Sequence, residues 1–192
     1  MKIQVILGST RQKRFGEQPA KWIVEKAKAK GFDVELLDLR DYPLPFFDEP
    51  IPPQALKGVY SNEIAQKWAD KIAEADGYIF VVAEYNAGAT GVLKNAIDYV
   101  YEGWVKKPVA FVGYGSVGGA RAIQQLRTVV NHLQMVPLSA AVHISNFWNL
   151  LDEQGNLKTE SFEKSADAML DQLVWWTKTL KAAREETTKT TS

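Results

Sequence analysis

The chain has 192 residues, of which 46% are apolar and 24% charged, a composition typical of a globular domain. Lysine plus arginine number 23 and aspartate plus glutamate number 23, and this balance disfavours general nucleic-acid or membrane-surface binding, which needs a basic excess. The absence of cysteine excludes disulfides, thiolate nucleophiles and Cys-ligated metal or iron–sulfur centres, and 2 histidines are too few for a His-rich metal site.

The first half of the chain alternates short apolar runs with longer stretches whose apolar residues recur at helical spacing. The expected elements are, in order, a strand at Ile3–Leu7, a helix at Pro19–Lys30, a strand at Val34–Leu39, a proline-rich loop at Tyr42–Pro53 and a helix with Ser61 as N-cap candidate that buries residues up to Ile72. The apolar run that begins at Met1 ends at Gly8, after about one strand, and a signal peptide or a membrane span needs a longer one. We therefore expect a cytoplasmic protein with no membrane partner.

The second half continues the same alternation. The expected elements are, in order, a strand at Gly77–Ala83, a helix at Ala89–Tyr101, a strand at Pro108–Gly113, a helix at Ala120–His132, a strand at Leu138–Ile144 and a long helix at Thr159–Ala183. Residues 184–192 are polar, and we expect them to form a frayed tail. No internal repeat or linker is visible, so residues 1–183 are expected to form a single domain.

Strands that alternate with helices predict an α/β fold with a parallel sheet covered by helices on both faces. Five such strands fit the flavodoxin-like three-layer sandwich, with a five-stranded sheet of order 2-1-3-4-5. In sheets of this kind, ligands bind beyond the carboxyl ends of the strands. The loops after the first, third and fourth strands should therefore face one shared site.

The first of these loops runs from Gly8 to Gly16 and has the composition of a phosphate site. Ser9 and Thr10 offer hydroxyl groups, and Arg11, Lys13 and Arg14 add positive charge with no acidic residue before Glu17. The start of the following helix supplies free N–H groups and the positive end of the helix dipole. The loop lacks the terminal Gly-Lys-Ser/Thr of a Walker A motif. The alternative is a solvated turn whose basic residues only keep it soluble.

The second loop runs from Ala83 to Gly88, after the most apolar strand. Tyr85 offers a ring that could stack on a planar heterocycle, and Asn86 offers hydrogen-bond partners for the edge of such a ring. The alternative is an Asx-type turn at a strand end, which Asn and Gly often form.

The third loop, from Gly113 to Gly119, contains a literal G-x-G-x-x-G between a strand and a helix. A dinucleotide-binding fingerprint normally opens the first βαβ unit and needs an acidic residue at the end of the next strand. Here the motif follows the fourth strand, and the next strand ends near His143. We therefore interpret these glycines as bare backbone that lies against a flat ring or a ribityl chain.

Taken together, these segments resemble the NADPH-dependent FMN reductase family, which includes quinone-, azo- and chromate-reducing flavoproteins. The resemblance extends from Met1 to about Ile144. The matching motifs are Gly8-Ser9-Thr10-Arg11 with Phe15-Gly16, Glu84-Tyr85-Asn86, Leu93-Lys94-Asn95-Ala96-Ile97-Asp98, Lys107-Pro108-Val109, and Gly113-Tyr114-Gly115-Ser116 with Gly118-Gly119.

The resemblance implies FMN as bound cofactor and NADPH or NADH as co-substrate. It implies that Ser9, Arg11, Phe15 and Gly16 hold the phosphate, that Glu84, Tyr85 and Asn86 line the isoalloxazine, and that Ser116 and Gly118 lie on its far side. The chain departs from the family at Ala83, where a proline is usual, which leaves this loop freer. The resemblance also implies a homodimer or homotetramer.

The activity expected from these residues is FMN-dependent NAD(P)H oxidation, with electrons passed in a ping-pong reaction to a small acceptor such as free flavin, a quinone or another electrophile. The flavin would carry the chemistry, so no side chain is assigned a catalytic role and no metal is needed. Three alternatives stay open at this point. The first is a flavodoxin-type electron carrier that needs a partner protein, the second is a Rossmann-type nicotinamide dehydrogenase built on Gly113–Gly118, and the third is a flavin-fold protein with no redox role that acts as an interaction scaffold.

Overall fold

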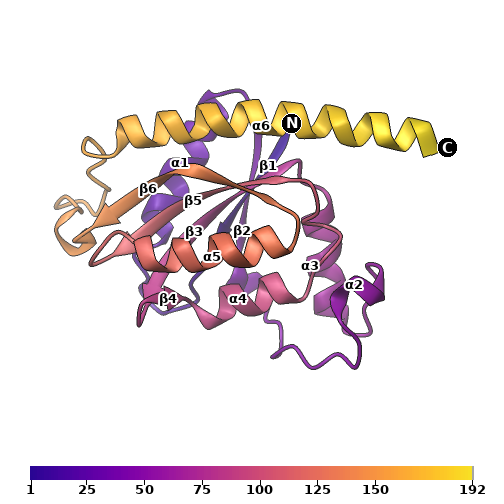
Figure 1. Cartoon of the computed structure of the whole chain (residues 1–192). Helices are drawn as coiled ribbons and strands as arrows, with labels where there is room; N and C mark the ends of the chain where they lie inside the picture. Colours follow the sequence, from indigo (N-terminus) through magenta and orange to yellow (C-terminus); the bar gives the residue numbers. More distant parts are fainter. Residues whose placement is uncertain (192) are drawn as a thin grey trace.

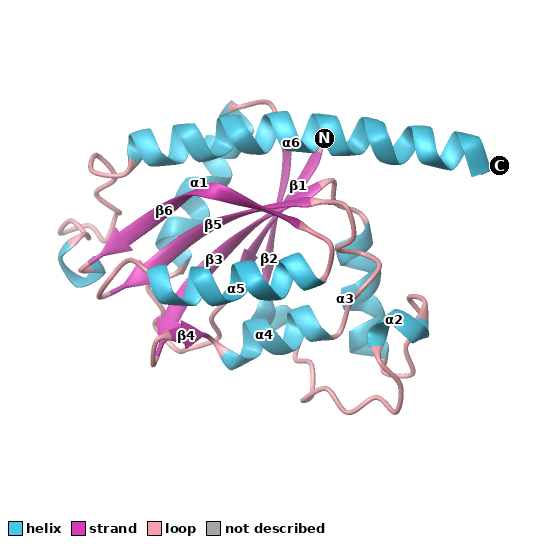
Figure 2. Ribbon diagram, viewed as in Figure 1, coloured by secondary structure: helices cyan, strands magenta, loops and turns pink. Residues whose placement is uncertain are grey.

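A computed structural model describes residues 1–191 of the chain. A central sheet lies between two helical layers (Figures 1 and 2). The strands are β1 (Lys2–Leu7), β2 (Asp33–Asp38), β3 (Gly77–Tyr85), β4 (Gly88–Ala89), β5 (Pro108–Gly115) and β6 (Val136–Ser145). The helices are α1 (Glu17–Ala29), η1 (Leu39–Asp41), α2 (Pro53–Leu56), α3 (Glu63–Ala73), α4 (Gly91–Asp98), α5 (Ala120–His132), η2 (Phe147–Asn149) and α6 (Glu163–Thr191).

The sheet has the order β2-β1-β3-β5-β6, and every neighbouring pair along this path is parallel. The short β4 lies off the path and pairs antiparallel with the end of β3. With β4 set aside, this is the predicted order 2-1-3-4-5, so the flavodoxin-like prediction is confirmed. Because all the main strands run in one direction, their carboxyl ends meet along one edge.

Two apolar clusters hold the three layers together. One face of the sheet packs against α3, α4 and α5, and its cluster contains the buried rings of Trp68, Phe80 and Trp104. The other face packs against α1 and α6, with Ile23 and Met169 among the buried residues. Both clusters draw side chains from β3 and β5, which explains why these two central strands are apolar along almost their whole length.

Several predicted boundaries are wrong for local reasons. The N-cap of α3 is Asn62 rather than Ser61, and its side-chain oxygen accepts from the amides of Ile64 and Ala65 at 2.9 and 3.0 Å. The helix expected from Ala89 is shorter, because Ala89 pairs with β3 and Thr90 caps the helix by accepting from the Leu93 amide. The final helix starts four residues later than expected and continues to Thr191, so helix α6 includes most of the expected tail.

The opposite edge of the sheet contains a buried amine. The Lys107 ammonium donates to the carbonyl oxygens of Ala73 at 3.1 Å and Ile72 at 3.4 Å, and it lies 3.2 Å from the Tyr78 hydroxyl. It therefore satisfies the last carbonyl groups of α3. Burial, together with the Arg184 charge and against the opposing effect of Asp76, lowers the pKa of Lys107 from 10.5 to about 8.

This lysine is expected to make stability depend on pH. Between the folded pKa of about 8 and the ordinary value of 10.5, the unfolded chain binds more protons at Lys107 than the folded chain. Stability from this group therefore rises with pH across that window. We expect the unfolding free energy of the wild type to gain about 1–2 kcal/mol over that of Lys107→Met between pH 7.5 and 9.5. Urea titrations at both pH values measure this, with Lys21→Met on the exposed side of α1 as control. A difference that stays constant with pH would contradict the expectation.

Candidate functional site

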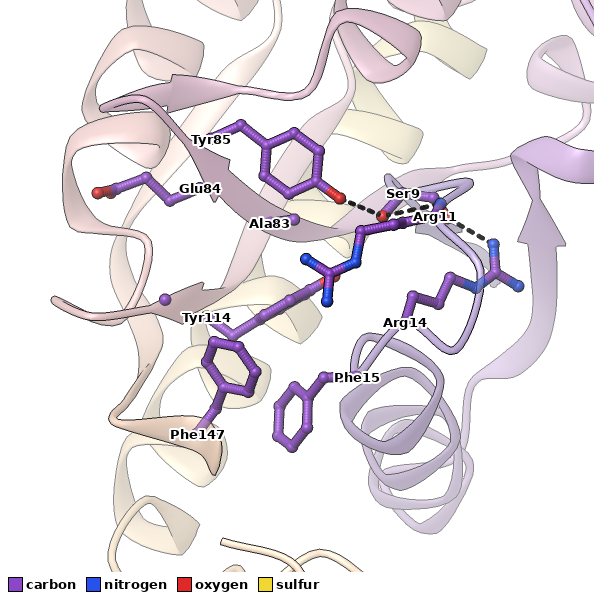
Figure 3. Close-up of a pocket in the computed structure, with 10 residues that line it drawn as sticks. Ser9, Arg11, Arg14, Phe15, Ala83, Glu84, Tyr85, Tyr114 and Phe147 are labelled. Atoms are coloured by element: carbon purple, nitrogen blue, oxygen red, sulfur yellow. Dashed lines mark hydrogen bonds between the residues drawn. The ribbon is translucent and has the colours of Figure 1, made fainter. Parts of the chain in front are cut away.

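A cavity of about 120 Å³ opens at the carboxyl edge of the sheet, where the loops after β1 and β3, the end of β5 and the start of η2 meet (Figure 3). Its lining residues are Ser9, Arg11, Arg14, Phe15, Ala83, Glu84, Tyr85, Tyr114, Gly115 and Phe147. The structure therefore brings Ser9, Arg11, Phe15, Glu84 and Tyr85 of the predicted site together. Gly16, Asn86, Ser116 and Gly118 lie close by in the chain but do not line this cavity.

The loop after β1 is held by hydrogen bonds at Gly8 and ends at Gly16, the N-cap residue of α1. The Gly8 amide donates to the Val81 carbonyl oxygen at 3.0 Å, and the Gly8 carbonyl accepts from the Thr90 hydroxyl. Ser9 is buried, and its hydroxyl lies 3.0 Å from the Tyr85 hydroxyl and 3.4 Å from the Arg11 amide. At the other end, Gly16 caps α1 without any side-chain hydrogen bond to the first turn. In the first turn of α1 the Gln18 amide donates to the Phe15 carbonyl oxygen at 3.0 Å and Pro19 has no N–H, so Glu17 has the one amide of residues 17–19 without a partner among the described residues.

The two arginines of this loop have different surroundings. The Arg14 side chain is only 3% exposed, and its guanidinium binds both carboxylate oxygens of Asp38, the Glu17 carboxylate at 3.1 Å and the Ser9 carbonyl oxygen. Burial by itself would raise the pKa of Asp38, but Arg14 and the Arg40 amide hold that pKa below its usual value. The charge of Arg14 is therefore paired with acidic side chains of the protein, and the ion pair with Asp38 joins the loop to the end of β2.

Arg11, in contrast, is exposed, and within the described part of the chain its guanidinium makes no hydrogen bond or ion pair. Figure 3 shows this guanidinium directed into the cavity, on the side of Tyr114. A cation without a partner among the described residues, beside a buried serine hydroxyl and the positive end of the α1 dipole, is suited to bind a phosphate dianion.

The opposite wall of the cavity is a tight hairpin. Glu84 and Tyr85 pair with Ala89 and Gly88, and the two turn residues between them, Asn86 and Ala87, both have positive φ, at 50° and 65°. This is the arrangement of a type I′ turn. The Tyr85 side chain reaches across the cavity to Ser9 (Figure 3). Asn86 lies in the turn, so its contact with a cofactor remains a prediction.

The carboxylate of Glu84 is directed away from the cavity in Figure 3, toward α5. One oxygen accepts from the backbone amides of Arg121 and Ala122 at 3.0 and 3.3 Å, and the other accepts from the Arg121 guanidinium. Burial would raise the pKa of Glu84, but these contacts with Arg121 and the helix amides lower it below its usual value. Glu84 borders the cavity, but its charge is directed toward the helix.

The glycines of the third loop are packed against protein. A Cβ at Gly113 would lie 2.5 Å from the Gly118 carbonyl oxygen, and one at Gly118 would lie 2.7 Å from the Cβ of His143 on β6. The His143 ring nitrogen Nδ1 is 3.0 Å from the same Gly118 oxygen. These glycines let α5 approach β5 and β6 closely, which accounts for the G-x-G-x-x-G pattern without a dinucleotide. Tyr114 and Gly115 are the residues of this segment that reach the cavity.

Tyr114 and Phe147 were missed from the sequence, and with Phe15 they form one wall of the cavity. The ring centroids are 5.4 Å apart for Phe15 and Tyr114, 4.7 Å for Phe15 and Phe147 and 5.7 Å for Tyr114 and Phe147. Burial raises the pKa of Tyr114 to about 12, so its hydroxyl stays protonated at neutral pH. Phe147 directly follows the last strand, so the sequence could have predicted its position at the carboxyl edge of the sheet.

The sequence of residues 1–149 matches the family described as NADPH-dependent FMN reductase. The chain belongs to this family. It is 44% identical over 135 residues to an NAD(P)H-dependent FMN reductase of Schizosaccharomyces pombe, which covers 70% of this chain and 68% of that protein. It is 30% identical over 186 residues to a 2-hydroxy-1,4-benzoquinone reductase of a Burkholderia species, which covers 92% of this chain and 96% of that protein.

Among solved structures, the flavoenzyme FerB of Paracoccus denitrificans, an NAD(P)H:acceptor oxidoreductase, has the same fold as this chain. The TM-score is 0.75 at 24% sequence identity, and the match covers 93% of this chain and 97% of FerB. A flavodoxin from Pseudomonas aeruginosa matches with a TM-score of 0.55 at 15% identity, over 93% of this chain and 99% of that one. Among the described residues, no helix is both long and apolar enough to cross a membrane.

Proposed function

We propose that the protein is an FMN-dependent NAD(P)H oxidoreductase that passes electrons to a small acceptor such as a quinone or free flavin. The observation that carries the proposal is the family match over residues 1–149, together with the cavity at the carboxyl edge of the sheet. The first two relatives named above are a reductase of FMN and a reductase of a benzoquinone. Both reactions deliver electrons to a planar, electron-poor ring.

The residues of the cavity fit FMN. The Arg11 guanidinium, which is unpaired among the described residues, and the buried Ser9 hydroxyl would hold the phosphate at the positive end of the α1 dipole. The hairpin backbone from Ala83 to Ala87 would support the ring system. Bound FMN supplies the hydride-accepting and hydride-donating chemistry, and the protein supplies binding, orientation and exclusion of water.

The walls of the cavity suggest one access face for both substrates. The aromatic wall of Phe15, Tyr114 and Phe147 closes one side, and the Tyr85 ring lies at the other (Figure 3). No acid–base pair is required for hydride transfer. Tyr85 is the residue placed to touch a nicotinamide and an acceptor in turn.

We also propose a homodimer or homotetramer in the cytoplasm. The segment between β2 and α3 exposes large apolar side chains, with Phe46 85% and Val59 71% accessible to solvent. Exposed apolar side chains on one segment favour a contact between protein surfaces.

The experiment that tests the function is steady-state kinetics of the purified protein with FMN and no partner protein. NADPH oxidation in the presence of a quinone should proceed, with parallel double-reciprocal lines, because NADPH must leave before the acceptor binds. Oxidation that requires an added protein would indicate an electron carrier. Intersecting lines would indicate separate pockets and a ternary complex.

Tyr85 variants test the shared face. Tyr85→Ala is expected to alter the rates with NADPH and with the acceptor together, and more strongly than it alters FMN affinity. Tyr85→Phe is the matched control, since it removes only the hydroxyl that lies 3.0 Å from the Ser9 hydroxyl. If Tyr85→Ala lowers the melting temperature and leaves the kinetics of the folded protein unchanged, the side chain serves packing instead.

A further inference from the structure

The carboxylate of Glu84 is the most fully bonded acidic group at the rim of the cavity. Its side chain is 3% exposed, and both oxygens are engaged, one by the backbone amides of Arg121 and Ala122 and one by the Arg121 guanidinium. Helix α5 starts at Ala120, and its N-cap Gly119 offers no side-chain acceptor. Glu84 therefore caps α5 from a different element, and a carboxylate at this end also complements the helix dipole.

The direction of this side chain follows from the strand. Successive residues of a strand alternate between its two faces, so Ala83 and Tyr85 share one face and Glu84 takes the other. Tyr85 projects toward Ser9 across the cavity, and Glu84 projects toward α5 (Figure 3). A residue whose carboxylate is already saturated by α5 has no charge left to offer to a ring in the cavity.

A second contact joins the same hairpin to the same helix. The Gln125 side chain, one turn further along α5, donates to the Ala87 carbonyl oxygen at 3.0 Å. The hairpin is thus attached to α5 at its base through Glu84 and at its turn through Ala87. Because Ala87 has a positive φ, which costs a non-glycine residue energy, the turn depends on such contacts to keep its shape.

We propose that Glu84 is a positioning residue: it holds the Glu84–Ala89 hairpin on the N-terminus of α5 and thereby sets the place of the Ala83–Ala87 backbone at the cavity. The proposal rests on the proposed function, in which this backbone supports FMN. It assigns Glu84 no direct contact with the cofactor. Its influence passes through the start of α5 at Arg121 and Ala122, and neither residue lines the cavity.

The test compares Glu84→Gln, Arg121→Met and the double variant with the wild type, and uses Glu25→Gln as control. Glu25 forms an exposed ion pair with Lys28 in the C-terminal half of α1 and does not line the cavity. FMN affinity is measured by fluorescence titration of the FMN-free protein, and thermal unfolding is measured in parallel. We expect each single variant to weaken FMN binding by about tenfold or more, the effect of losing one charge-assisted contact. The double variant should bind no worse than Glu84→Gln alone, because the Arg121 guanidinium acts on the hairpin only through the Glu84 carboxylate.

The variant Arg121→Lys and hydrogen exchange distinguish a positioning role of Glu84 from a direct contact with the cofactor. Arg121→Lys keeps the charge without the fork of N–H groups and should recover part of the affinity. Hydrogen exchange of the protein alone should be faster at residues 85–88 and at the amides of Arg121 and Ala122 in Glu84→Gln, and unchanged in α1.

Three results would overturn the proposal. The first is a Glu84→Gln variant with weakened FMN binding but unchanged hydrogen exchange at the amides of residues 121 and 122, which would mean that Glu84 acts on the cofactor without its link to α5. The second is a loss of melting temperature in both variants with unchanged FMN affinity. The third is unchanged exchange in the hairpin, which decides the question even without FMN. A wild-type protein that binds no FMN would instead refute the proposed function, and the exchange measurement would still judge the role of Glu84.

Discussion

Arg11→Ala is expected to weaken FMN binding by about ten- to a hundredfold, the range given by a charge-assisted hydrogen bond of about 1.5–3 kcal/mol. Its unfolding free energy should stay close to that of the wild type. The reason is that the Arg11 guanidinium makes no ion pair within the described residues and projects into the cavity. Removing it takes away a ligand for the phosphate and leaves no buried acid without a partner.

Arg14→Ala is expected to act mainly on the fold. Its guanidinium is bonded to Asp38, Glu17 and the Ser9 carbonyl, so truncation leaves the half-buried Asp38 carboxylate without its main partner. Breaking such a pair from one side costs about 3 kcal/mol or more. The cost should shrink at low pH, because Asp38, whose pKa is lowered in the folded protein, becomes protonated there and no longer needs the cation.

The two variants form a matched pair, since each removes a guanidinium group from the loop between β1 and α1. Urea unfolding of the FMN-free proteins and FMN titration at low and high salt measure both effects. High salt should reduce the wild-type affinity more than that of Arg11→Ala, because only the wild type has that charge to screen. If Arg14→Ala keeps its stability but loses FMN, or if Arg11→Ala binds FMN as the wild type does, the roles assigned here are wrong.

The sequence predicted the sheet order because strand and helix periodicities differ clearly and because parallel strands need crossovers. It also located the loops that meet at the cavity, since carboxyl ends of parallel strands share an edge. The prediction that Glu84 lines the isoalloxazine was based on its motif alone. Whether a side chain at a strand end projects into a site or toward a helix depends on strand phase and on the neighbour, here the amides of Arg121 and Ala122.

The other features that the sequence did not predict depend on contacts between residues that are distant in the chain. Arg14 and Arg11 look alike in the sequence, and only the fold shows that Asp38, 24 residues further on, neutralises one of them. The glycines of Gly113–Gly119 illustrate the converse case. A pattern of small residues is the same whether a cofactor or a protein backbone fills the space beside it, and here His143 fills it beside Gly118.

Gly118→Ala is therefore expected to destabilise the fold, with loss of FMN as a consequence. The added Cβ would lie 2.7 Å from the His143 Cβ and 2.9 Å from the His143 carbonyl carbon, and that backbone belongs to β6, so it has little room to move. The residue also has a φ of +64°, which L side chains rarely adopt. Strain of this kind costs about 1–2 kcal/mol, and overpacking adds about 1–3 kcal/mol.

The variant Gly155→Ala separates the cost of backbone strain from the cost of overpacking. Gly155 has a φ of +82°, and a Cβ there would meet nothing within 4 Å, so this variant carries the backbone strain alone. Thermal and urea unfolding measure the stability of both FMN-free variants. Gly155→Ala should be slightly less stable than the wild type, and Gly118→Ala should be clearly less stable than both. A Gly118→Ala protein as stable as Gly155→Ala, yet unable to bind FMN, would show that the glycine serves the cofactor, as the sequence suggested. If Gly118→Ala loses stability and FMN binding together, the role of Gly118 is instead to let α5 pack against β6. FMN binding is then lost because the cavity is built from the ends of several strands and depends on the spacing between them.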